Sequence, residues 1–129
     1  MAVPRRVLVV TCLALSVGVP AAAASLSPAA VLRGVWAYDN RAVSVTGTLA
    51  RAQVWISPGG ARYYRFELAE GRSALPVLAP PVVRCEAGRP ATVDGMFRRL
   101  FVVDGVLLER VLEAARVECT EAPEDDDGG

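Results

Sequence analysis

Histidine and lysine are both absent from this chain of 129 residues, so every basic side chain is an arginine. Without histidine, the chain lacks the usual general base near neutral pH and the commonest metal ligand in proteins. Its serines have no imidazole to activate them, and Gly59–Gly60 is not followed by the G-K-[ST] of a phosphate-binding loop. No group of side chains has metal-ligand spacing. We therefore expect no catalytic residue, no metal and no cofactor.

Beyond the N-terminus, no apolar run approaches the length of a transmembrane segment. At the N-terminus, Arg5–Arg6 is followed by the apolar stretch Val7–Val19, and the small residues Ala22–Ala24 precede Ser25. A positive segment, a short apolar segment and a small-x-small site are together typical of a secretory signal peptide. Residues 1–24 are therefore predicted to be removed, which leaves no transmembrane segment and places the mature chain in the periplasm or outside the cell.

Charge is balanced over the whole chain but is unevenly distributed along it. Between Ser25 and Thr120 there are twelve arginines and nine carboxylates, whereas residues 121–129 carry five carboxylates and no large apolar side chain. We expect this acidic tail to be disordered and solvated. The small positive surplus of the folded part argues against strong binding to phosphates, since such affinity needs many contacts.

Residues 25–42 are expected to contain one short helix that covers an end of the core. Ser27 can cap this helix and Pro28 suits its first turn, and the helix should end by Asp39–Asn40. One apolar face is predicted from the helical spacing of Val31, Leu32, Val35 and Trp36.

The chain then alternates as half-buried strands do. Residues 43–49 form the first strand, with Gly47 on its inward side, where a glycine permits a bend or a close backbone approach. Val54 and Ile56 are apolar at even-numbered positions, whereas the inward side of residues 43–49 falls on odd-numbered positions. A bulge that shifts the alternation by one residue is therefore predicted near Arg51.

A turn at Ser57–Gly60 leads to the clearest strand, residues 62–68. Its inward side is predicted to carry Tyr64, Phe66 and Leu68, and its outer side Tyr63 and Arg65. Residues 75–78 form a short third strand, in which Pro76 indicates an irregular or edge position.

Two more strands are predicted after the turn at residues 86–90. The fourth covers residues 92–97, and Asp104–Gly105 predicts a tight hairpin. Residues 107–117 fit either a helix or a strand. Local propensity favours the helix, whereas a five-stranded barrel needs a closing strand, which is the interpretation we adopt.

These elements follow the plan of an OB-fold, a capping helix followed by a long bent strand, a meander and two further strands. The residues that carry the likeness are Val43–Leu49, Tyr64–Leu68, Gly88 with Thr92–Phe97, and Leu112–Val117. Through them the chain resembles the extracytoplasmic OB-fold domains called tRNA_anti-like and, more loosely, the bacterial periplasmic OB-fold (BOF) proteins. The resemblance implies an all-β domain with one N-terminal helix, in which residues 43–120 form a five-stranded OB-fold-like Greek-key barrel.

Cys85 and Cys119 are the two cysteines that remain after the predicted leader. Two cysteines in an exported domain are expected to be bonded. In an OB barrel the third and fifth strands run parallel, which would bring both cysteines to the same rim. The predicted disulfide would stabilise the domain by about 2–4 kcal/mol. A redox-active role would call for a C-x-x-C motif, and none is present.

A possible binding face combines basic and aromatic side chains on the first two strands. Its members are Arg51, Trp55, Arg62, Tyr63 and Arg65. The resemblance implies an exported, non-catalytic binding module of the bacterial envelope that takes a protein partner or a small polar ligand. The alternative is a polyanion, oligonucleotide or oligosaccharide on the barrel face, although export and the slight charge make nucleic acid the less expected partner. The other interpretation is that Trp55 and Tyr63 are partly buried barrel-surface residues, packed under the N-terminal helix or a partner.

Overall fold

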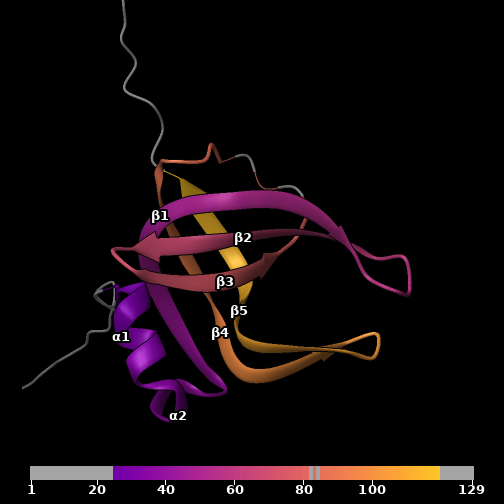
Figure 1. Ribbon diagram of the computed structural model, residues 1–129, viewed down its shortest axis with the longest axis horizontal. Helices are drawn as coiled ribbons and strands as arrows, with labels where there is room; N and C mark the ends of the chain where they lie inside the picture. The colour runs from indigo at the N-terminus through magenta and orange to yellow at the C-terminus, as the bar shows by residue number, and fades with distance from the viewer. Residues whose placement is uncertain (1–24, 82, 84, 120–129) are drawn as a thin grey trace, which may run out of the picture.

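The computed structural model describes residues 25–81, 83 and 85–119, so the predicted leader (1–24) and acidic tail (121–129) lie outside the described residues. The described chain begins with two short helices and continues with five strands (Figure 1). These elements are α1 (Pro28–Arg33), α2 (Val35–Tyr38), β1 (Arg41–Ile56), β2 (Arg62–Glu70), β3 (Ser73–Ala79), β4 (Pro90–Val103) and β5 (Val106–Cys119). Over these described ranges, neither helix has the length or the apolar character needed to cross a membrane.

The five strands close into a barrel in the order β1-β2-β3-β5-β4, and β4 pairs back onto β1. Neighbouring strands are antiparallel except for β3 and β5, which run parallel. This arrangement confirms the predicted all-β, OB-fold-like barrel, including its parallel third and fifth strands. The barrel begins at Arg41, slightly earlier than the predicted residue 43.

β1 is shared between two neighbouring strands because it bends. Residues 41–48 pair with β4, and residues 48–56 pair with β2. Gly47 lies near this changeover, where a Cβ atom would be 2.9 Å from Pro28 Cγ and 3.1 Å from the carbonyl oxygen of Ala69. A side chain would therefore not fit without a shift, so the glycine permits both the bend and the close approach of the N-terminal helix.

The predicted bulge in β1 is present. The register between β1 and β2 shifts between Ala50 and Gln53, and Arg51 has a φ of 56°. However, Val54 and Ile56 beyond the bulge are 53% and 56% exposed. The bulge turns the strand as expected, but this part of β1 runs past the barrel core into a hairpin, so its apolar residues are not buried.

The barrel interior is filled by apolar side chains that alternate along the strands, as half-buried strands require. Nine valine, leucine and phenylalanine side chains from the five strands are at most 1% exposed: Val45, Leu49, Phe66, Leu68, Leu75, Val77, Val93, Phe97 and Leu112. Each contributes about 1.5–3 kcal/mol of burial free energy relative to an exposed position. Tyr64 packs against this core while partly buried, in agreement with its predicted inward direction.

β4 and β5 form one long hairpin. The predicted fourth strand, residues 92–97, extends without a break to the predicted hairpin at Asp104–Gly105, as the single strand β4. At the tip, Asp104 and Gly105 have φ values of 50° and 83°. Two consecutive left-handed residues are what a two-residue type I′ turn requires, so the predicted hairpin is confirmed.

The ambiguous segment 107–117 is a strand. It pairs with β4 on one side, and Leu112 and Glu113 pair with Val77 and Leu78 of β3 on the other. Its glutamates, alanines and leucines are good helix formers. Pairing on two sides and burial of Leu112 supply tertiary interactions that outweigh this local preference.

The N-terminal segment forms two helices instead of the one predicted. Ser27 caps α1 as expected, because its Oγ accepts a hydrogen bond of 3.0 Å from the Ala30 N–H. Gly34 then interrupts the helix with φ −114° and ψ 40°. The break changes the phase: Val31 is fully buried, but Trp36 is 76% exposed and is not on the core-facing side where helical spacing placed it.

Two hairpins extend beyond the barrel on the same side (Figure 1). We call residues 53–65, the end of the β1–β2 hairpin, the first arm. Residues 98–111, the end of the β4–β5 hairpin, are the second arm. In an OB-fold such loops frame the face on which ligands bind, so the packing of the arms determines what this face can do.

Candidate binding face

Three of the five predicted binding-face residues lie on one surface of the first arm. Trp55 is directly opposite Tyr63, and Gln53 is directly opposite Arg65. Cross-strand partners share a face of the sheet, as do residues two apart on one strand. The structure therefore brings Trp55, Tyr63 and Arg65 together, and it adds Gln53, which the sequence analysis did not select.

A groove of about 480 Å³ adjoins this surface and crosses β1, β2 and β3. The groove is lined by Arg51, Ala52, Gln53, Arg65, Phe66, Glu67 and Pro76. Arg51 thus joins the predicted set, but its Nε lies 3.5 Å from Glu67 Oε1. Because the Arg51 side chain is 81% exposed, this ion pair adds little stability and mainly neutralises one side of the groove.

Arg65 occupies the middle of a longer surface. A smaller hollow of about 140 Å³ shares Arg65 and Pro76 with the groove and continues to Leu107 and Glu109 on the second arm. In the described part of the chain, the guanidinium of Arg65 has no ion pair or hydrogen bond. Its N–H donors lie in one plane, in an arrangement that matches the two oxygens of a carboxylate or phosphate. These donors are available to a ligand.

Trp55 and Tyr63 are not an open stacking surface. Their ring centroids lie 5.7 Å apart in a tilted arrangement, and both rings are partly buried. They pack into a small second core that we call the arm cluster, formed by Trp55, Tyr63, Leu78, Phe101, Val103, Leu108 and Val111. The aromatic pair joins the two arms, as the packing interpretation expected, although the contacts come from the second arm and not from the N-terminal helix.

The tips of the two arms are also joined by hydrogen bonds. The Ser57 hydroxyl donates to Asp104 Oδ2, and the Gly59 N–H donates to the same oxygen at 3.2 Å. Ser57 is only 3% exposed and also accepts a hydrogen bond of 3.1 Å from the Ala61 N–H. The sequence assigned Ser57 and Asp104 to separate turns, because a contact between residues so far apart leaves no local signal.

Arg62 is separated from the other predicted residues. It is exposed and pairs with Ile56, and it is adjacent in sequence to Tyr63. Because successive residues of a strand point to opposite faces, Arg62 and Ile56 lie on the side of the first arm that faces away from the arm cluster.

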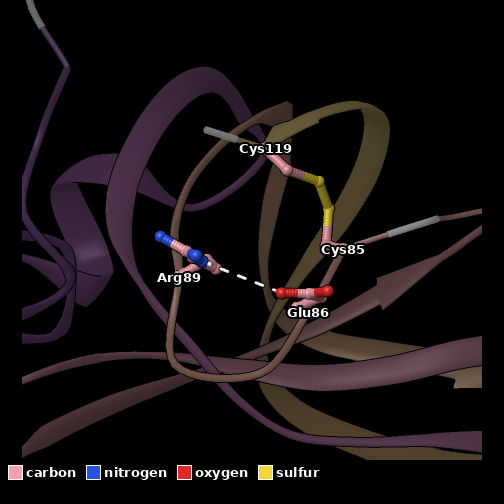
Figure 2. Close-up of a disulfide and its surroundings, with 4 residues drawn as sticks. All are labelled: Cys85, Glu86, Arg89 and Cys119. Carbon is pink, nitrogen blue, oxygen red and sulfur yellow. Dashed lines mark ion pairs between the residues drawn. A yellow bond between two sulfur atoms is a disulfide. The ribbon is translucent and has the colours of Figure 1, made fainter. Parts of the chain in front are cut away.

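The predicted disulfide joins Cys85 and Cys119, with Cα atoms 5.6 Å apart (Figure 2). It links the loop after β3 to the end of β5. Glu86 and Arg89 form an ion pair of 3.8 Å in the same loop (Figure 2), and the Leu49 N–H donates to the Arg89 carbonyl at 2.9 Å. The loop is therefore fixed both to β5 and to β1.

Among residues 25–81, 83 and 85–119, no group of three or more histidine, cysteine, aspartate or glutamate side chains is placed to hold a metal ion. No model of a known protein family matches the chain, and no characterised protein matches its sequence. The geometry of the groove is therefore the basis for the function proposed below.

Proposed function

We propose that the protein is a non-catalytic binding module of the bacterial envelope, of the kind represented by the tRNA_anti-like and BOF proteins. Its groove across β1, β2 and β3 binds an anionic, polar ligand: a carboxylate-bearing segment of a partner protein or a small polar molecule. The sequence of residues 1–24 supports export, and the disulfide suits an oxidising compartment.

The free guanidinium of Arg65 carries this proposal. It lies in the wall of the groove beside its cross-strand partner Gln53, and no described carboxylate lies within ion-pair distance of it. An arginine of this kind binds a carboxylate through two parallel N–H···O bonds, which fixes orientation as well as affinity. Gln53 adds amide donors and an acceptor beside it.

Polar recognition is favoured over base stacking because the aromatic side chains are already occupied. Trp55 and Tyr63 contact the second arm in the arm cluster, so stacking of bases on them would require the arms to separate. The basic residues of the groove also include one, Arg51, whose charge is offset by Glu67. The groove has too few unpaired cations for a ligand that depends on many phosphate contacts.

The test compares Arg65→Gln with Arg72→Gln, a matched change at an exposed arginine in the β2–β3 turn. The probes are a short glutamate-rich peptide, a single-stranded oligonucleotide and heparin, each titrated at physiological salt. We expect the peptide to bind and Arg65→Gln to weaken it about tenfold or more, as for loss of a charge-assisted hydrogen bond. Arg72→Gln should leave the affinity unchanged.

Two outcomes would overturn the proposal. If both variants weakened peptide binding equally, the binding would depend on the general positive charge of the protein and not on Arg65. Tight retention of the oligonucleotide or heparin, abolished by Trp55→Ala, would favour the polyanion alternative.

A further inference from the structure

A second concave surface lies on the outside of the barrel and shares no lining residue with the groove described above. It has a volume of about 560 Å³, within the range of small-molecule sites. It crosses β1, β4 and β5, and its lining includes alanines together with Ser44, Asp94, Met96, Arg98 and Glu113. We call it the outer groove.

The hollow exists because its floor is made of small residues. Ser44 and Asp94 face outward, since their strand neighbours Val45 and Val93 are fully buried inside the barrel. At Gly95 the strands come unusually close, as a Cβ atom there would be 2.2 Å from the carbonyl oxygen of Glu113. Alanines on β1 and β5 leave the remaining floor low and apolar.

One end of the outer groove is electrically neutral and its polar groups are engaged. Arg98 Nη2 lies 3.0 Å from Glu113 Oε1, and Arg98 Nη1 donates to Asn40 Oδ1 at 3.0 Å. The guanidinium also lies 5.6 Å from the centre of the Phe101 ring. Few donors or acceptors at this end are left for a ligand.

The other end offers acceptors without partners. Within the described ranges, the Asp94 carboxylate has no ion pair and the Ser44 hydroxyl has no hydrogen bond. Arg116 is the cross-strand neighbour of Asp94, but its guanidinium is paired with Glu118. Since Arg98 and Arg116 are each paired with a glutamate, neither offsets the carboxylate of Asp94, which leaves its negative charge beside an apolar floor.

We propose that the outer groove binds a small aliphatic amine, with its ammonium on Asp94 and Ser44 and its hydrocarbon stem over Met96 and the alanine floor. An ammonium supplies three donors and a positive charge, which matches two free acceptors and one unbalanced carboxylate. The hydrocarbon stem matches the apolar lining, on which it would pack. This site is independent of the proposed anion-binding groove, because the two take ligands of opposite charge on different strands.

The experiment titrates the purified protein with n-hexylammonium and follows backbone amide shifts by NMR. Hexanoate and hexanol serve as probes of equal length with a negative charge or none. We expect saturable shifts confined to the residues of the outer groove, tighter binding of hexylammonium than of hexanol, and no binding of hexanoate. Asp94→Asn should weaken hexylammonium about tenfold or more and leave hexanol unchanged.

Two further variants make the result specific. Glu109→Gln removes an exposed carboxylate on the second arm and should leave binding unchanged, whereas Ala42→Phe fills the outer groove and should abolish binding of both hexylammonium and hexanol. Equal affinity for hexylammonium and hexanol, unchanged binding in Asp94→Asn, or shifts located at the arms would each overturn the proposal. Because the anionic peptide is predicted to bind through Arg65, its affinity in Asp94→Asn should stay unchanged, which separates the two proposals.

Discussion

Replacement of Gly95 by alanine is the most direct test of the barrel geometry. The added Cβ would lie 2.2 Å from the carbonyl oxygen of Glu113 and 2.9 Å from the Cα of Ala114. Both are backbone atoms of β5, so the clash cannot be relieved by a change of side-chain rotamer. β4 and β5 must move apart where the register already shifts, between Asp94 and Gly95.

The expected cost follows from two terms. Overpacking in a site that cannot adjust costs about 1–3 kcal/mol, and the loss of one ladder hydrogen bond adds about 1 kcal/mol. A total of about 2–4 kcal/mol is a large part of the free energy of unfolding of a domain of this size, which is about 5–14 kcal/mol. The melting temperature should fall by about 10–25 °C.

The assay is thermal and urea unfolding followed by circular dichroism. Gly71→Ala is the matched control, since Gly71 has a φ of 60° and no atom within 4 Å of its Cβ position, so that only backbone strain of about 1 kcal/mol is added. If Gly95→Ala were no more destabilised than Gly71→Ala, the close approach of β4 and β5 would not exist in solution.

Three further predictions concern the disulfide, the contact between the arm tips, and the burial of Trp36 and Phe97. Replacement of both disulfide cysteines by serine should lower the free energy of unfolding by about 2–4 kcal/mol, and the unreduced, denatured mature protein should take up no thiol label. Asp104→Ala should cost about 1–3 kcal/mol and shift the fluorescence of Trp55 to the red, measured in a Trp36→Phe background. Glu109→Ala on the same arm should do neither, and an unchanged spectrum in Asp104→Ala would show that the tips are not joined. Trp36→Ala should cost less than about 1 kcal/mol, because Trp36 is exposed and mainly contacts a guanidinium. Phe97→Ala should cost about 3–5 kcal/mol, and similar losses for the two would contradict the assigned burial.

The sequence predicted the barrel well because its strands, hairpin and bulge each depend on residues that are close together in the chain. Alternation of apolar residues placed Phe66 and Leu68 inside, Asp104–Gly105 marked the hairpin, and the change of parity after Gly47 located the bulge at Arg51. These features depend on neighbours in the chain, which a single sequence displays directly.

The arms were not predictable in the same way. Val54 and Ile56 have the pattern of buried strand residues but lie beyond the core, and alternation does not reveal where a strand leaves its barrel. The predicted core-facing position of Trp36 was wrong because Gly34 interrupts the helix and changes its phase. The contacts of Trp55 with the second arm depend on the three-dimensional meeting of two hairpins, so the sequence could name the aromatic residue but not its packing.

The parallel contact between β3 and β5 consists of two residue pairs, Val77 with Leu112 and Leu78 with Glu113. Pro76 has no N–H to donate, and the contact starts just after it. This narrow seam joins segments far apart in the chain, so it carries a high loop-closure cost and should form late in folding. The disulfide lies beyond the end of the seam that follows Leu78 and Glu113, and the arm cluster reaches the other end through Val111, which precedes Leu112. Native-state hydrogen exchange should therefore find that reduction lets the barrel open from the cysteine end while the arms remain closed.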